Sequence, residues 1–346
     1  MKNKHIYFVI IALSTLASCK KNSETLPKSF EKKMSLSEPT STLYEPLTVI
    51  TIAGKLYKTG YADGTGEQAR FNILGGIDLT DDGNLYVCDM GNNKIRKITP
   101  AGVVSTVNIP AVANGNAFIR PKCVQVSKDG TLNILRDPYF NDTYVVWIVK
   151  PNGQILTPQS HNKYYRYFDL QPDPYNETIW LGGARTIASR PVIEKFKIGD
   201  DGRIGTNPYH APIDSLTGDG KRYPYITSLF CAANGVKYIV INNTHIYKYT
   251  KSGVFTQIFR SLKFNYITSI IANRDSRSIY IADKGDIKTI TDGKLTYLVG
   301  YNRVSEQLDG VGNKASVYAI YLALSNDENT IYFTDASSRV RKLILR

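Results

Sequence analysis

The amino-acid sequence predicts an all-β fold, a six-bladed β-propeller of four-stranded antiparallel blades, with its ring closed by an N-terminal strand at residues 48–54. Three observations support this fold: six turns of one kind recur after residue 47, five hairpins of a second kind lie between them, and a spare strand precedes the first unit. The roughly 300 residues involved suit six units of about 50 residues, and such a period is typical of repeat architectures.

Turns divide each unit into short apolar strands. Turns of the second kind all end in glycine, as expected of tight hairpins between antiparallel strands. The six turns of the first kind lie at residues 81–84, 128–130, 172–174, 233–235, 275–277 and 327–329. The five of the second kind lie at residues 100–102, 151–153, 200–202, 251–253 and 291–293.

The last unit lacks a fourth strand because the chain ends at Arg346, directly after its third strand. Residues 49–54 have the composition of residues 295–300, a fourth strand that likewise ends in glycine. We therefore predict that residues 48–54 complete the last blade. This closure removes two exposed sheet edges.

Two units repeat closely. The pattern D-G-x-G-x-x-A occurs at residues 63–69 and 309–315, and an aspartate follows each first aspartate 26 residues later. Residues 94–98 then match residues 339–343 once one residue is removed from the intervening turn. This unit closely resembles the NHL repeat, strongly over the first and last units and weakly between them. The resemblance implies a six-bladed propeller.

The N-terminal segment has the order of a secretory signal. Lys2 and Lys4 precede an apolar run at residues 6–13, which is shorter than the roughly 20 residues of a membrane span. Residues 16–19, Leu-Ala-Ser-Cys, resemble the lipobox of bacterial lipoproteins, which implies lipidation of Cys19 and its exposure as the new N-terminus. An ordinary signal peptide with a chance cysteine is the alternative.

The expected organisation is a signal peptide at residues 1–18, a lipidated cysteine with a flexible polar tether at residues 19–46, and a propeller at residues 47–346. Residues 20–22, Lys-Lys-Asn, do not resemble the aspartate that retains lipoproteins in the inner membrane. We therefore expect lipid anchorage in the outer membrane, with the cell-surface and periplasmic faces both open.

The chain is basic. Its formal net charge of +13 becomes +11 when the two lysines of the signal peptide are removed. Export separates the protein from cytoplasmic nucleic acid, so we expect no nucleic-acid partner. Anionic glycans, lipid headgroups or acidic proteins remain as partners, and a charge that only maintains solubility is the alternative.

Cysteines and histidines give no metal or cofactor signal. Beyond Cys19, three cysteines lie in apolar, strand-like stretches and are expected to be buried thiols, with a disulfide as the minor alternative. The three histidines of the mature chain lack the spacing of a zinc site. These residues are Cys88, Cys123, Cys231, His161, His210 and His245.

We expect the candidate ligand face where the turns between second and third strands meet the loops that lead into the next blade. The longest departures from the repeat lie there, at residues 137–144, 184–190 and 209–223, and excursions from a rigid scaffold commonly carry binding sites. Their aromatic and arginine side chains suit sugar rings or protein hot spots, although many of the 24 tyrosines must pack between blades. The candidates are Tyr139, Tyr144, Tyr164, Tyr165, Arg185, Arg190, Arg222 and Tyr223.

Two further sets of polar residues are expected to be structural or to line the axis. Aspartates that end second strands are expected to accept N–H bonds in the turn rather than to hold a cation, and the D-G-x-G loops lack the further acidic ligands of a calcium loop. Polar residues of the innermost strands would make the axial channel polar. The two sets are Asp89, Asp137, Asp283 and Asp335, and Asp78, Gln125, Asp169, Ser228 and Ser269.

The favoured function is a non-catalytic lipoprotein whose propeller face binds a glycan, a peptide or a protein partner, as an accessory to an outer-membrane nutrient transporter. An architectural subunit of an outer-membrane complex is the first alternative. The second is an enzyme, since similar six-bladed propellers include metal-dependent lactonases and lyases. The innermost strands offer no matching His or Glu set and no Ser-His-Asp set, so no catalytic residue is assigned.

Overall fold

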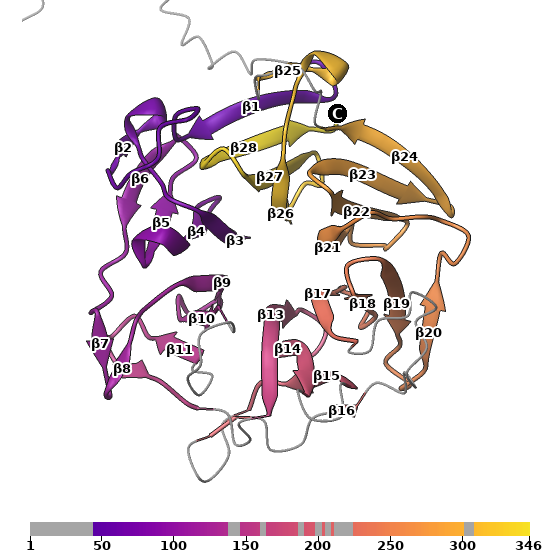
Figure 1. The fold of residues 1–346 in the computed structure, drawn as a ribbon, viewed down its shortest axis with the longest axis horizontal. Coiled ribbons are helices and arrows are strands. Elements are labelled where there is room, and N and C mark those ends of the chain that lie inside the picture. The colour runs from indigo at the N-terminus through magenta and orange to yellow at the C-terminus, as the bar shows by residue number, and fades with distance from the viewer. Residues whose placement is uncertain are drawn as a thin grey trace, which may run out of the picture. The chain divides into compact units, whose positions relative to one another are not determined.

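The computed structural model describes residues 44–137, 146–159, 164–185, 190–197, 203–204, 209–210, 224–300 and 308–346. Six antiparallel sheets surround a common axis, so the predicted six-bladed propeller is confirmed (Figure 1). Among the described residues, no helix is long and apolar enough to cross a bilayer. The residues assigned to the signal peptide, together with Cys19 and residues 20–43 of the tether, lie outside the described residues.

Each blade begins with a strand at the axis and proceeds outward. The innermost strands are β3 (Leu74–Leu79), β9 (Pro121–Val126), β13 (Tyr165–Asp173), β17 (Ile226–Cys231), β21 (Ile267–Ala272) and β26 (Ala319–Leu324). The second strands are β4 (Leu85–Asp89), β10 (Leu132–Arg136), β14 (Thr178–Arg185), β18 (Lys237–Ile241), β22 (Ser278–Asp283) and β27 (Thr330–Asp335). In this order they belong to blades 1 to 6.

The outer half of each blade holds the third and fourth strands. The third strands are β5 (Lys94–Ile98), β11 (Val146–Val149), β15 (Arg190–Lys195), β19 (His245–Tyr249), β23 (Asp286–Thr291) and β28 (Arg339–Ile344). The fourth strands are β6 (Val103–Thr106), β12 (Ile155–Leu156), β16 (Tyr209–His210), β20 (Phe255–Ile258), β24 (Lys294–Val299) and, in blade 6, β1 (Thr48–Ala53).

Hydrophobic cores lie between neighbouring blades. Phe71 and Ile98 of the blade 1 segment pack with Ala53 and Val340 of blade 6, and the other cores likewise join consecutive blades. A sheet that is apolar on both faces needs a neighbour on each side to exclude water. The ring supplies both neighbours to every blade.

The N-terminal strand closes the ring as predicted. β1 pairs antiparallel with β28, with Val49 opposite Leu343 and Ile50 opposite Lys342. The Leu47 N–H donates to the Ile344 carbonyl at 2.7 Å and extends this pairing. Figure 1 shows β1 lying outside β28, β27 and β26.

The two D-G-x-G loops fasten the fourth strands of blades 1 and 6. Each forms a two-residue strand and a short 3-10 helix: β2 (Gly64–Thr65) with η1 (Gly66–Gln68), and β25 (Gly310–Val311) with η3 (Gly312–Lys314). β2 pairs with β6, and β25 pairs with β1. The repeated sequence motif is therefore a structural clasp over the outer edge of each blade.

A buried arginine ties each clasp to the blade beneath it. Arg341 donates to Asp335 at 2.9 Å and to Asp309 at 2.8 Å, and Asp309 also accepts the Thr51 N–H of β1 at 2.7 Å. Arg341 is fully buried, as is Asp335. One guanidinium thus joins the second, third and fourth strands of blade 6 across the closure, with charge-assisted hydrogen bonds.

The same arrangement recurs in blade 1, where Arg96 donates to Asp89 at 2.8 Å and to Asp63 at 2.6 Å. Burial alone would raise the pKa of Asp63, but hydrogen bonds from Arg96 and Thr106 outweigh it and lower that pKa. Burial raises the pKa of Asp89 in spite of its donors. Both matching units found in the sequence are therefore equivalent in three dimensions.

Polar residues of the innermost strands bond from blade to blade. Asp169 accepts the Leu229 N–H at 2.7 Å, and Asp78 accepts the Val126 N–H at 2.7 Å. Ser228 and Ser269 accept N–H groups of the following blades in the same way. Four of the five residues expected to make the channel polar thus satisfy backbone donors, and the fifth, Gln125, accepts from Asn133 within blade 2.

One hairpin was not foreseen. β7 (Val112–Ala113) and β8 (Asn116–Ala117) form a small separate sheet in the connection between blades 1 and 2. Asn114 and Gly115 both have positive φ angles, 51° and 76°, which is the conformation of a two-residue Asn-Gly hairpin turn. The Asn-Gly pair at these two positions is the sequence signal for this turn.

The three cysteines of the described residues are buried and unpaired, as predicted. Burial raises the pKa of each thiol well above its usual value. They pack as small apolar side chains: Cys88, Cys123 and Cys231 belong to three different inter-blade cores.

Candidate functional site

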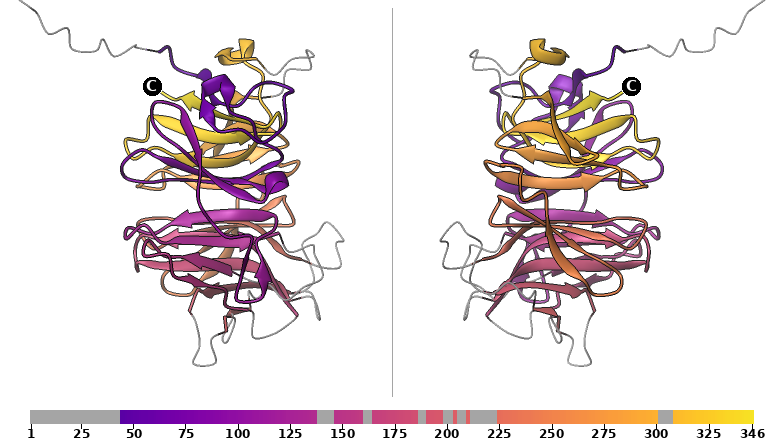
Figure 2. Two further views of the ribbon diagram at one scale, coloured as in Figure 1. Left: turned by 90° about the vertical axis from the view of Figure 1, so that its left-hand side faces the viewer. Right: turned by 90° about the vertical axis from the view of Figure 1, so that its right-hand side faces the viewer.

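Turns and entry loops share one face of the ring, as predicted. The Lys284 N–H, after β22, donates to the carbonyl of Tyr266, before β21, at 2.9 Å. In blade 4 the Asn242 N–H donates to the Tyr225 carbonyl in the equivalent way. The Ile267 N–H bonds to the Asn243 carbonyl of the preceding blade at 2.6 Å. We call this the loop face. Figure 2 shows the ring edge-on, with strands running between its two faces.

The aspartates that end second strands organise the loop face. Asp283 accepts the Asn265 N–H at 2.8 Å and the Tyr266 N–H at 2.7 Å, and Asp335 accepts the Ser337 N–H at 2.9 Å. The structural interpretation is confirmed for both residues and for Asp89, which accepts the Asn72 N–H. Most of these donors belong to the entry loop rather than to the turn itself.

Each of these aspartates also binds a cation of its own blade, which the sequence did not indicate. Lys288 lies 2.8 Å from Asp283, and Arg120 donates to Asp137 at 2.9 Å. Within the described ranges, no three His, Cys, Asp or Glu side chains gather in a way that could hold a metal ion.

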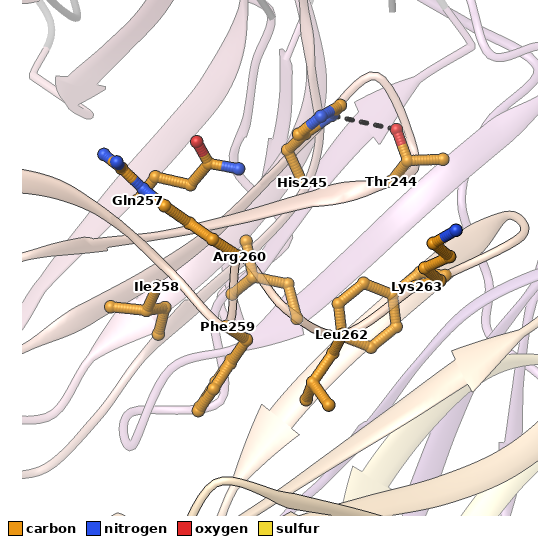
Figure 3. A pocket seen from close by; sticks show the side chains of 10 residues that line it. Thr244, His245, Gln257, Ile258, Phe259, Arg260, Leu262 and Lys263 are labelled. Carbon is orange, nitrogen blue, oxygen red and sulfur yellow. Dashed lines mark hydrogen bonds between the residues drawn. The ribbon is translucent and has the colours of Figure 1, made fainter. Parts of the chain in front are cut away.

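A pocket of about 250 Å³ opens on the loop face between blades 4 and 5 (Figure 3). We call it the rim pocket. It is built by the start of β19, the end of β20 and the loop into blade 5. Its lining residues are Thr244, His245, Ile246, Gln257, Ile258, Phe259, Arg260, Leu262, Lys263 and Phe264.

Strand pairing brings the two walls of the rim pocket together. Ile246 of β19 lies opposite Ile258 of β20, so the turn that carries Thr244 and His245 faces the chain leaving β20. A tight turn follows, in which the Leu262 N–H donates to the Phe259 carbonyl at 3.0 Å. Both walls therefore rest on the blade 4 sheet.

Hydrogen bonding fixes the orientation of His245. The Thr244 hydroxyl donates to the Asn242 carbonyl at 3.2 Å, so its oxygen accepts from His245 Nδ1 at 2.9 Å. Figure 3 shows this bond at the upper edge of the pocket. The second ring nitrogen, Nε2, is then available to a ligand.

The rim pocket combines an apolar wall with positive charge. Phe259, Leu262 and Phe264 supply apolar surface, while Arg260 and Lys263 are exposed. No acidic residue lines the pocket, and neither cation pairs with a carboxylate of the residues that the structure describes. The site can therefore bind an amphipathic group with negative charge or hydrogen-bond acceptors.

Three predicted ligand-face residues meet at the loop-face end of blade 3. Tyr165 lies opposite Arg185, and Arg185 lies opposite Arg190, across β13, β14 and β15. Tyr165 is only 8% exposed and packs into the core between blades 2 and 3, so it offers little surface to a ligand.

Arg190 is exposed, whereas Tyr164 and Arg185 are half-buried. The structure thus places Arg185 and Arg190 together, with Tyr164 next to Tyr165 at the start of β13. Four other predicted residues lie outside the described residues: Tyr139, Tyr144, Arg222 and Tyr223.

The residues of the rim pocket were not singled out in the sequence, although residues 242–245 and 260–266 belong to the loops of this face. The signal was present in residues 259–264, Phe-Arg-Ser-Leu-Lys-Phe, where two aromatic and two basic side chains occur in a short segment after a strand. This segment is short, and the longer departures from the repeat elsewhere in the sequence are more conspicuous.

A second cavity, also of about 250 Å³, lies at the axis on the face opposite the loop face. It is lined by the ends of innermost strands, including Asp78, Gln171 and Phe230. Burial raises the pKa of Asp78 to about 7, although hydrogen bonds from Val126 and Leu79 oppose that shift. Near neutral pH this carboxyl is half protonated.

Comparisons with known proteins identify the fold. No protein-family model matches the sequence, and no curated protein matches it either. A structural genomics protein of unknown function from Bacteroides thetaiotaomicron is 16% identical with a TM-score of 0.65, over 86% of this chain and 75% of that one.

Two further solved structures show the range of the fold. An auxiliary nutrient binding protein from Bacteroides ovatus is 14% identical with a TM-score of 0.63, over 86% of this chain and 76% of that one. Virginiamycin B lyase from Staphylococcus aureus is 16% identical with a TM-score of 0.52, over 87% and 99% of the chains. At these identities the similarity shows the propeller fold alone.

Proposed function

We propose that this chain is a non-catalytic binding lipoprotein of the cell envelope, whose loop face binds a soluble nutrient or an envelope partner. The rim pocket carries this proposal, because it offers uncommitted polar groups beside an apolar wall on a rigid sheet. Pockets with these properties are typical of ligand sites. The fold similarity to auxiliary nutrient binding proteins of two Bacteroides species is consistent with it.

The anchoring part of the proposal rests on the sequence. The lipobox-like residues 16–19 support acylation of Cys19, and several acyl chains would hold the propeller at the outer membrane. The polar residues 20–46 would then act as a tether. Such a protein can present a captured solute to a nutrient transporter in the same membrane.

A pull-down of the full-length protein from detergent-solubilised membranes tests this proposal, with fractionation of a Cys19→Ser variant beside it. We expect a stoichiometric transporter to be recovered with the lipidated protein, and loss of membrane association in the variant. A stoichiometric set of envelope structural proteins, without a transporter or a bound solute, would instead favour the architectural alternative. Turnover of a lactone by the purified protein would contradict the non-catalytic assignment.

A further inference from the structure

We propose that the rim pocket binds a sugar-sized ligand that carries a carboxylate or sulfate group, an inference that rests on the proposed binding function.

The charges of the rim pocket are unbalanced. Arg260 and Lys263 flank it with His245, and no described residue of its lining is acidic. Figure 3 shows the nitrogen atoms of these three residues at separate points around the pocket, with Gln257 near Arg260. Guanidinium and ammonium groups bind carboxylate and sulfate with charge-assisted hydrogen bonds.

The apolar wall and the size of the pocket favour a sugar ring. Phe259, Leu262 and Phe264 are half-buried against the core between blades 4 and 5 and line the pocket beside its polar groups, which suits a ring that has an apolar face and a polar edge. A volume of about 250 Å³ lies just below the range of pockets for drug-sized ligands, roughly 300–1,000 Å³. One ring, or one unit of a longer chain, therefore fits.

The backbone at the pocket is strained. Phe259 has a φ angle of 57°, a left-handed conformation that is unfavourable for a bulky side chain. Such residues often cluster at functional sites, where surrounding structure holds them in place. Here the strained residue directs the chain from β20 across the mouth of the pocket.

A second pair of cations lies on the loop face, in blade 3. Arg185 and Arg190 lie directly opposite each other where β14 and β15 meet their connecting turn. Like charges in this arrangement are destabilising. Arg185 Nε is also buried without a hydrogen-bond partner among the residues that the structure describes. A bound anion would reduce the repulsion between the two arginines and would accept a hydrogen bond from Arg185 Nε.

Calorimetric titration of the full-length mature protein in detergent with galacturonate and with galactose tests the inference. The two sugars differ only in the group at carbon 6, a carboxylate in the first and a hydroxymethyl in the second. We expect galacturonate to bind at least tenfold more tightly. A double variant, Arg260→Gln with Lys263→Gln, should lose at least tenfold in galacturonate affinity.

The control is a double variant with the same loss of charge, Lys294→Gln with Lys314→Gln, at exposed positions outside the pocket. We expect it to retain the parent affinity within twofold.

Equal affinity for the two sugars, or equal losses in the pocket and control variants, would overturn the inference. So would an acidic peptide that binds at the pocket more tightly than galacturonate. Binding of galactose alone would overturn it while leaving the proposed binding function intact. If neither sugar binds, the acidic-sugar inference fails, and the membrane pull-down decides the proposed function separately.

Discussion

Replacement of Arg341 by methionine tests the clasp that closes the ring. The substitution preserves most of the side-chain volume and removes the cation between Asp335, which is fully buried, and Asp309, whose side chain is 41% exposed. Breaking a buried ion pair by removing one partner costs about 3–5 kcal/mol. We expect the lower part of that range, about 3–4 kcal/mol, because Asp335 keeps its bonds from Tyr318 and Ser337.

The assay is equilibrium unfolding in urea followed by circular dichroism, with hydrogen exchange of the β1 amides. Arg96→Met removes the equivalent arginine of blade 1 and should destabilise the protein by a similar amount. Only Arg341→Met should accelerate exchange in β1, because Asp309 fastens that strand through Thr51. The exposed Arg277→Met serves as a surface control. A cost below about 1 kcal/mol for Arg341→Met, as expected of an exposed pair, would refute the reasoning.

Three further predictions follow from the structure. The folded-state pKa of Asp78, about 7, lies above its ordinary value of 3.8, so the folded state binds this proton more tightly and stability falls as pH rises from about 4 to 7. In urea unfolding across this range, Asp78 should therefore contribute a decline of up to about 4 kcal/mol, and Asp78→Asn should show a decline smaller by that share; identical pH profiles would contradict it. The three buried thiols should resist a thiol reagent in the native protein and react in urea, whereas rapid native labelling would be inconsistent with their burial. Metabolic labelling with palmitate should mark the wild-type protein but not Cys19→Ser, and equal labelling would exclude lipidation at that residue.

Ring closure could be predicted from the sequence because the number of turns of each kind shows that one blade lacks a strand. Six first turns and five hairpins leave one blade a strand short, and residues 48–54 are the segment with a matching pattern. The clasps depend on contacts between distant residues. Asp63, Asp89 and Arg96 recur at equivalent positions in the last unit, but spacing within one sequence does not show that their side chains meet.

The loop face was also predictable, since strand alternation fixes which turns lie at the same end of each blade. Individual side chains were harder to assign. Tyr165 is of a residue type that is common in ligand sites, but its side chain is buried. The sequence does not show that β13 already begins at this residue. Conversely, the rim pocket forms where Phe259 reverses the chain after β20, a local conformation that its residue type disfavours.

Nuclear magnetic resonance of backbone amides, during titration of the full-length mature protein with galacturonate, shows directly whether the loop face binds a ligand at the rim pocket. We predict that the largest chemical-shift changes occur at residues 244–246 and 257–264, which line or adjoin the pocket. Changes confined to the axial cavity around Asp78 and Phe230, or no saturable change, would contradict the claim.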